Sequence, residues 1–186
     1  MSDYVLILKG SPRESGNSST LAEQVAAGAK DSGAEVESIS LHELDIRPCD
    51  ACDSCRETGG VCVIKDDMQE LYPKLRRAQA IVLASPVYWF TLSAQAKLCI
   101  DRWYAFVTPE GNDLRGKKFG LVLTYGDTDL YTSGGINAIH TFESMCRYLR
   151  TDIVGMVYGS ADKPGEVINQ PELMEKAYQL GRKLVA

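Results

Sequence analysis

The sequence predicts an α/β fold in which helices cover both faces of a doubly wound, five-stranded parallel sheet. Short β-rich runs alternate with amphipathic segments along the chain, which is the pattern of successive βαβ units. Three of the five runs are nearly continuous in apolar residues, as expected of strands that are buried on both faces. Right-handed crossovers leave few topologies for such a sheet. The commonest order is 2-1-3-4-5, with a ligand crevice beyond the carboxyl ends of strands 1, 3 and 4.

The individual elements can be placed from the local pattern. The expected strands are Tyr4 to Lys9, Ala34 to Leu41, Ala80 to Ser85, Lys118 to Tyr125 and Asp152 to Tyr158. Three helices are indicated by apolar stripes at helical spacing: Leu21, Val25 and Ala29, then Leu92, Ala96, Cys99, Ile100, Trp103 and Val107, and finally Leu173, Ala177, Leu180 and Leu184. Asp66 followed by Gln69 indicates a capping box at the start of a further helix.

Composition and charge narrow the classes of function. The 186 residues suit one domain, residues 1–186, with a cysteine-rich loop at about 47–65. A net charge of −5 without a basic run disfavours nucleic acid and anionic membranes as partners and favours a small molecule or a protein. No signal segment or long apolar run is apparent, so we expect a cytoplasmic protein. His42 and His140 belong to no hydrolytic motif.

The segment after the first strand, Gly10 to Thr20, predicts an anion site. It runs from a turn into a helix, where free backbone NH groups and the helix dipole favour negative charge. Its hydroxyls can donate to phosphate oxygens and Arg13 can neutralise their charge, which suits a terminal phosphate monoester such as that of FMN. The fingerprints of dinucleotide and ATP sites are absent from this segment. Ser, Asn and Gly are also ordinary loop and cap residues. The candidate ligands are Ser11, Arg13, Asn17, Ser18, Ser19 and Thr20.

Two further loops should face the same crevice. After the third strand, Pro86 is expected to end the ladder, and three aromatic residues follow against which a flat ring could lie. After the fourth strand, a loop containing Gly126 could approach the edge of that ring closely. Exposed loop aromatics are often plain packing residues. The candidates in these two loops are Pro86, Val87, Tyr88, Trp89, Phe90, Tyr125, Gly126 and Asp127.

These loops resemble those of the NADPH-dependent FMN reductase group of the flavodoxin-like superfamily. The resemblance is carried by GSPRESGNSST at 10–20 and SPVYWF at 85–90, continued by Lys97 and Asp101-Arg102. It implies that Ser11, Arg13, Ser18, Ser19 and Thr20 hold the FMN phosphate and that residues 86–90 flank the isoalloxazine. It also implies a homodimer or homotetramer, with Trp103, Tyr104 and Phe106 either at the subunit interface or in the core.

Four cysteines lie close together between the second strand and the following helix. Cys49, Cys52, Cys55 and Cys62 have the spacing C-x2-C-x2-C-x6-C, and the first three match the start of a bacterial ferredoxin run. The motif resembles that of the iron-sulfur flavoproteins, a branch of the same group, which implies a [4Fe-4S] cluster that exchanges electrons with FMN. Reduced structural thiols, a Cys49–Cys52 dithiol and a zinc site are the alternatives. Cys99 and Cys146 are expected to be buried small hydrophobes.

The pattern as a whole favours an FMN-dependent oxidoreductase in which the flavin does the chemistry. With a cluster, a ferredoxin-type protein could donate electrons; without one, NAD(P)H would reduce the flavin, and a quinone or similar molecule would accept the electrons. An electron carrier resembling flavodoxin is a different possibility, and a binding module without flavin is a third. Turnover of NAD(P)H would exclude the carrier, and failure to bind FMN would favour the binding module.

Overall fold

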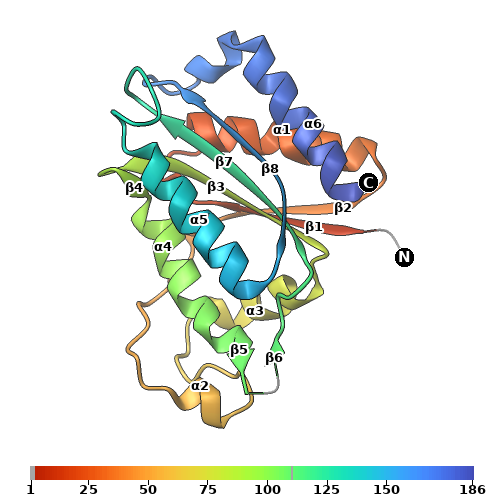
Figure 1. Ribbon diagram of the computed structural model, residues 1–186, viewed down its shortest axis with the longest axis vertical. Helices are drawn as coiled ribbons and strands as arrows, with labels where there is room; N and C mark the ends of the chain where they lie inside the picture. The colour runs from red at the N-terminus through yellow and green to blue at the C-terminus, as the bar shows by residue number, and fades with distance from the viewer. Residues whose placement is uncertain (1–2, 110) are drawn as a thin grey trace.

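The computed structural model describes residues 3–109 and 111–186 and is built around a parallel sheet (Figure 1). Five strands run in the order β2-β1-β3-β7-β8, which is the predicted order 2-1-3-4-5. Every neighbouring pair along this order is parallel. The strands are β1 (Tyr4–Lys9), β2 (Glu35–Ser40), β3 (Ala80–Tyr88), β7 (Lys118–Tyr125) and β8 (Asp152–Ser160). The predicted doubly wound fold is therefore confirmed.

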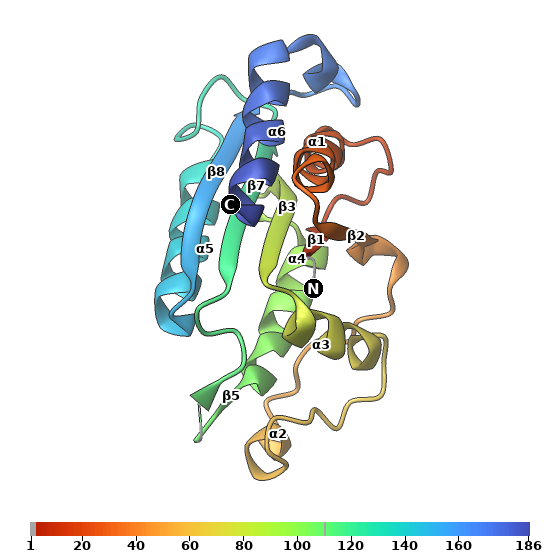
Figure 2. The same cartoon turned by 90° about the vertical axis from the view of Figure 1, so that its right-hand side faces the viewer.

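Helices cover both faces of the sheet, as Figures 1 and 2 show. Alternate residues of the strands point to opposite faces, so that Val5 and Ile7 join one apolar core while Leu6 and Leu8 join the other. The first core lies under α1 (Asn17–Asp31) and α6 (Pro171–Val185). The second lies under α3 (Met68–Arg77), α4 (Ala94–Asp101) and α5 (Gly135–Leu149). None of the helices in the described ranges is long and apolar enough to cross a membrane.

Two glycines allow α1 and α6 to lie in close contact. A Cβ atom on Gly28 would come within 2.0 Å of the Tyr178 carbonyl oxygen, and one on Gly181 within 2.0 Å of the Val25 carbonyl oxygen. Because no side chain fits at either position, the helix backbones touch directly.

The third strand is longer than expected and ends in a hairpin. Pairing with β7 does stop at Pro86, which lies opposite Thr124. The strand nevertheless continues to Tyr88 and pairs with the short antiparallel strand β4 (Thr91–Leu92). Trp89 and Phe90 form the connecting turn, both with positive φ, of 45° and 66°. This tight turn holds the two aromatic side chains outside the core. Trp89 is 92% exposed and Phe90 is 55% exposed.

Other elements differ from the pattern in their details. The stripe from Leu92 to Val107 divides into α4 and a 3₁₀ helix, η2 (Arg102–Phe106). Trp103 and Phe106 are buried in this chain, whereas Tyr104 is exposed. Cys99 and Cys146 are buried, as expected. The short remaining elements are η1 (Leu41–Glu43), α2 (Ser54–Glu57), the hairpin β5 (Val107–Thr108) with β6 (Gly111–Asn112), and η3 (Glu166–Asn169).

The predicted capping box is wrong. Asp66 does accept a hydrogen bond from the Met68 backbone NH, at 3.2 Å, but its carboxylate is mainly engaged with the Arg102 guanidinium. Gln69 does not reach back to the helix start; its amide donates to the carbonyls of Cys62 and Ile64, at 3.0 and 2.6 Å. Both side chains fasten the cysteine-rich loop, a long-range role that local spacing does not reveal.

Candidate functional site

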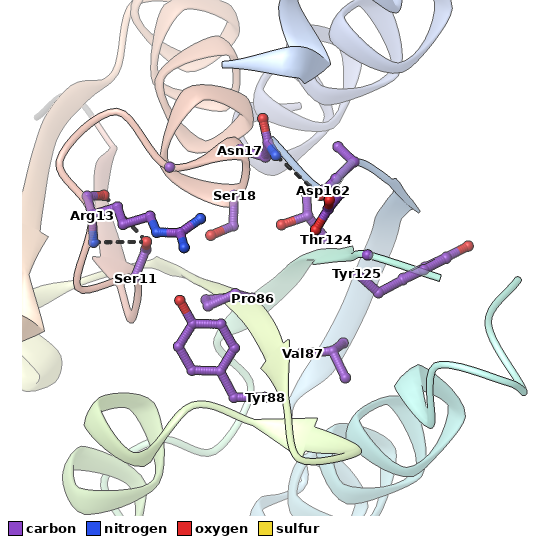
Figure 3. Close-up of a pocket in the computed structure, with 13 residues that line it drawn as sticks. Ser11, Arg13, Asn17, Ser18, Pro86, Val87, Tyr88, Thr124, Tyr125 and Asp162 are labelled. Carbon is purple, nitrogen blue, oxygen red and sulfur yellow. Dashed lines mark hydrogen bonds between the residues drawn. The ribbon is translucent and has the colours of Figure 1, made fainter. Parts of the chain in front are cut away.

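The loop between β1 and α1 forms one wall of a pocket at the carboxyl ends of the strands (Figure 3). The Ser11 hydroxyl accepts from the Arg13 backbone NH at 3.1 Å and donates to the Arg13 carbonyl at 3.2 Å, which closes a tight turn. Gly16 has no room for a side chain, because a Cβ atom there would lie 2.5 Å from the Ser11 hydroxyl oxygen. The turn directs the Arg13 guanidinium into the pocket, towards the Ser18 side chain.

The pocket fits an anion that carries several acceptor oxygens. The α1 helix starts at Asn17 with no side-chain cap on its first amides, so backbone donors and the positive end of the helix dipole face the pocket. The Ser18 hydroxyl lines the same space and is buried without a hydrogen-bond partner among the described residues. A buried hydroxyl without a partner costs about 1–3 kcal/mol. A phosphate oxygen would satisfy it, and the Arg13 side chain supplies the opposite charge.

The other predicted phosphate ligands hold the loop in place. The Asn17 amide lines the pocket but donates to the carbonyls of Ala161 and Lys163, at 3.1 and 2.9 Å, while its oxygen accepts from the Val167 backbone NH. The Ser19 and Thr20 side chains do not line the pocket, and their hydroxyls donate to loop carbonyls at 3.5 and 3.2 Å.

A second hollow adjoins this pocket and is lined by the predicted ring-binding residues. The two cavities have volumes of about 190 Å³ and 260 Å³, each below the usual size of a cofactor site. They share Val87, Tyr125 and Gly126, so together they provide a polar end that continues into a partly aromatic one. Pro86 and Tyr88 line the polar cavity; Trp89, Phe90, Asp127, Thr132 and Ser133 line the second.

Close packing fixes the aromatic turn against the loop that follows β7. A Cβ atom on Gly134 would lie 2.4 Å from the Phe90 Cβ, and Gly134 has a φ of +72°, which favours glycine. The Asn137 side-chain amide donates to the Phe90 carbonyl at 3.2 Å. Burial raises the pKa of Tyr125 above its usual 10, and Tyr158 and Asp129 raise it further.

Two residues that line the polar cavity lie outside the loops considered in the prediction. They are Ala161 and Asp162, which follow β8, whereas Thr124 lies within β7, one residue before its end. The prediction considered only the loops after the first, third and fourth strands, whereas β8 lies beside β7 and its carboxyl end opens at the same edge of the sheet. The segment after β8 is fastened there by Glu166, whose carboxylate accepts from the backbone NH groups of Asp162 and Lys163.

The cysteine-rich loop lies away from this pocket, beside η2. Cys49 and Cys52 are exposed, and Cys55 and Cys62 are partly buried. Burial raises the pKa of the Cys55 thiol, and Cys62, Cys49 and Cys52 raise it further, so each of these three lies close enough to Cys55 to affect its ionisation. Ala51, between the first two cysteines, has a φ of 55°, which is strained for a residue other than glycine.

The donor chemistry of this loop fits a metal cluster. Four thiols in one short segment are the ligand set of a [4Fe-4S] cluster, although they would also satisfy zinc. Within residues 3–109 and 111–186, no three Cys, His, Asp or Glu side chains are grouped as a formed metal site. Ligation would therefore need a rearrangement of the cysteine side chains.

The sheet order, the uncapped helix and the adjoining aromatic hollow define a flavodoxin-like fold whose pocket suits a phosphate-bearing flavin. Comparison with known proteins agrees. The sequence matches the family of NADPH-dependent FMN reductases over residues 4–163. The chain therefore belongs to this family and is an FMN-dependent oxidoreductase.

Individual relatives agree with this assignment. An iron-sulfur flavoprotein of Methanocaldococcus jannaschii is 33% identical over 97% of this chain and 94% of its own length. An iron-sulfur flavoprotein of Archaeoglobus fulgidus is 32% identical over 94% of this chain and 76% of its own length. The NAD(P)H:quinone oxidoreductase of Methanothermobacter marburgensis shares the fold, with a TM-score of 0.79 at 20% identity, covering 99% of this chain and 98% of that one.

Proposed function

We propose that this FMN-dependent oxidoreductase is an iron-sulfur flavoprotein that moves electrons between FMN and a [4Fe-4S] cluster held by Cys49, Cys52, Cys55 and Cys62. The observation that carries the proposal is the four-thiol loop, whose spacing suits a cluster, in a chain with an FMN pocket. The printed names of the relatives from Methanocaldococcus and Archaeoglobus support it.

Bound FMN would supply the redox chemistry, and the protein would supply position and electrostatics. Arg13 and Ser18 would hold the phosphate, together with the first amides of α1. Val87 and Tyr125, which line both cavities, would lie where the phosphate end continues towards the ring. Trp89 would cover the open side of the ring.

The two proposed redox sites would lie at opposite ends of one helical segment. The α4 helix is capped by Ser93, whose hydroxyl donates to the Gly10 carbonyl beside the phosphate loop. At the far end, η2 contacts the cysteine loop through Arg102 and Tyr104. Eight α-helical and three 3₁₀ residues lead from Ser93 to Tyr104, a rise on the order of 20 Å. We therefore infer a homodimer or homotetramer in which the cluster of one copy approaches the flavin of another.

A ferredoxin-type protein or NAD(P)H would donate electrons, and a small molecule such as a quinone would accept them. No separate dinucleotide fingerprint exists in the sequence, so a nicotinamide would stack on the exposed side of the flavin. A cytoplasmic setting, where thiols stay reduced, fits the unpaired cysteines.

The deciding experiment measures iron, acid-labile sulfide and flavin on protein purified without oxygen. About four irons and four sulfides per FMN are expected. Flavin without iron would exclude the cluster and leave an NAD(P)H-dependent FMN or quinone reductase. A third outcome would point to an electron carrier. In that case only a protein donor would reduce the flavin, and the protein would neither oxidise NAD(P)H nor turn over a small acceptor.

A further inference from the structure

The guanidinium of Arg102 is buried beside the cysteine-rich loop. Its side chain has no exposed surface, and neither has that of Asp66, with which it forms a two-pronged ion pair. A buried arginine is costly unless its charge and its donors are matched. Asp66 matches the charge, yet the Nε atom of Arg102 is buried without a hydrogen-bond partner in the part of the chain that the structure describes. Burying an arginine here therefore costs more free energy than a well-packed apolar side chain would.

The remaining donors of Arg102 reach both ends of the cysteine loop. Its Nη1 atom donates to the Arg47 carbonyl at 2.9 Å, two residues before Cys49. Its Nη2 atom donates to the Cys62 sulfur at 3.3 Å. An ion pair with Asp66 that served only the fold would not require a hydrogen bond from Arg102 to the Cys62 sulfur. One side chain thus joins the beginning of the loop, its last cysteine and Asp66, two residues before α3 begins.

A cation in this place has a consequence for a cluster. Four thiolate ligands concentrate negative charge, and reduction of a cluster adds one more negative charge. Reduction potentials of iron-sulfur clusters depend on net charge and on hydrogen bonds to the sulfurs. A guanidinium that donates to a ligand sulfur favours the more negative, reduced state.

We propose that Arg102 is a positioning residue of the cysteine site, which fixes the Cys62 sulfur by a charged hydrogen bond and offsets the negative charge of the ligands. This inference rests on the proposed function, because it requires that the four cysteines bind a cluster. It predicts that loss of the guanidinium makes the cluster more labile and lowers its reduction potential.

The test compares two double variants with the wild type, all purified without oxygen. Arg102→Met with Asp66→Asn removes the guanidinium without leaving a buried carboxylate unpaired. Arg76→Met with Asp113→Asn is the matched control, because Arg76 also pairs with an aspartate and donates to the loop at the Gly60 carbonyl, but contacts no sulfur. Iron release to a chelator, the cluster potential by redox titration, FMN content and circular dichroism are measured.

We expect the Arg102 variant to release iron about tenfold to a hundredfold faster and to have a more negative cluster potential, with unchanged FMN content. The control should behave as the wild type. If the double variant does not fold, Arg102→Lys keeps Asp66 paired but loses the two-pronged donor, and the same faster release is expected. A folded Arg102 variant with wild-type release and potential overturns the inference alone. A wild type that binds FMN without iron overturns the proposed cluster as well.

Discussion

Ser18 is a residue at which binding and stability should respond in opposite directions. Its hydroxyl is buried without a partner in the phosphate pocket. Ser18→Ala should weaken FMN binding about tenfold to a hundredfold, since a hydrogen bond to a charged group is worth about 1.5–3 kcal/mol. The same change should leave the FMN-free protein as stable as before or slightly more stable, because an unsatisfied buried group is removed. Fluorescence titration of FMN and urea unfolding check the two halves.

The matched control for Ser18 is Thr20→Val. Thr20 also carries a hydroxyl in the first turn of α1, but its hydroxyl donates to the Gly16 carbonyl and lies outside the pocket. The valine variant should keep its FMN affinity and lose some stability. Equal loss of affinity in the two variants would mean that the phosphate does not contact Ser18.

The role of a residue could be predicted from the sequence where its interaction partners lie close to it along the chain. Arg13 and Ser18 line the predicted pocket because they lie in the strand-to-helix loop that defines it. Asn17 belongs to the same loop, but its amide bonds to the segment after β8, about 145 residues away in the sequence. The partner of Asp66 is likewise remote, since Arg102 lies 36 residues further along the chain. Spacing within a loop carries no information about such partners.

The α1–α6 contact is the element-scale feature most sensitive to one added methyl group. Gly181→Ala would place a Cβ atom 2.0 Å from the Val25 carbonyl oxygen. The helices must then separate, which should lower the free energy of unfolding by about 1–3 kcal/mol, even though alanine favours helix over glycine by about 1 kcal/mol. Urea unfolding measures the change.

Gly120→Ala is the control for that contact. Its added Cβ atom would meet side-chain methyl groups of Leu180 and Val82 at 3.4 Å, an ordinary van der Waals distance, under the same helix α6. It should cost much less than the change at Gly181. A Gly181 variant as stable as the Gly120 variant would show that α1 and α6 can shift apart freely.

The edge strand β2 is joined to its neighbours by an ionisable group. Burial opposes ionisation of Glu37, but hydrogen bonds from Lys74 and Tyr4 and the charges of Lys74 and Arg77 outweigh it, so the pKa of Glu37 is lowered below its usual 4.5. A lowered pKa in the folded state stabilises the protein above the unfolded pKa. This stability is lost as the pH falls through the folded value.

Glu37→Gln should therefore flatten the pH dependence of stability below about pH 4.5. Because the carboxylate is about one third exposed, the contribution at neutral pH should be no more than about 1 kcal/mol. Urea midpoints of the variant and the wild type are compared at pH 7 and pH 4. If both lose the same stability between these values, Glu37 does not contribute to the acid sensitivity.

At the scale of elements, the sequence predicted the repeated β–α units but not the point at which β3 ends. The β–α alternation gives five strands in the right order, because apolar runs and right-handed crossovers leave few choices. The end of β3 was predicted at Ser85, yet the chain turns back at Trp89 and Phe90 into a hairpin. Two consecutive aromatic residues with positive φ are uncommon. Packing of Phe90 against Gly134 supports that turn, and the contact is visible only in three dimensions.

At the scale of the molecule, the flavin site joins segments from across the chain. The pocket is lined by residues in or just after the carboxyl ends of β1, β3, β7 and β8, so bound FMN would contact four separate strand ends. A ligand that binds the folded state alone stabilises it by about 2.7 kcal/mol at a concentration one hundred times its dissociation constant. We expect FMN to raise the free energy of unfolding by this amount, measured by urea unfolding of flavin-free protein.

Riboflavin separates the contribution of the phosphate from that of the ring. It carries the same ring without a phosphate, so the Arg13 guanidinium and the Ser18 hydroxyl would gain no anionic partner. At equal concentration it should stabilise the wild type much less than FMN does, and Ser18→Ala should narrow the difference. Equal stabilisation of the wild type by the two ligands would place the phosphate outside the β1–α1 loop. The uncapped start of α1 would then need another anion to explain it.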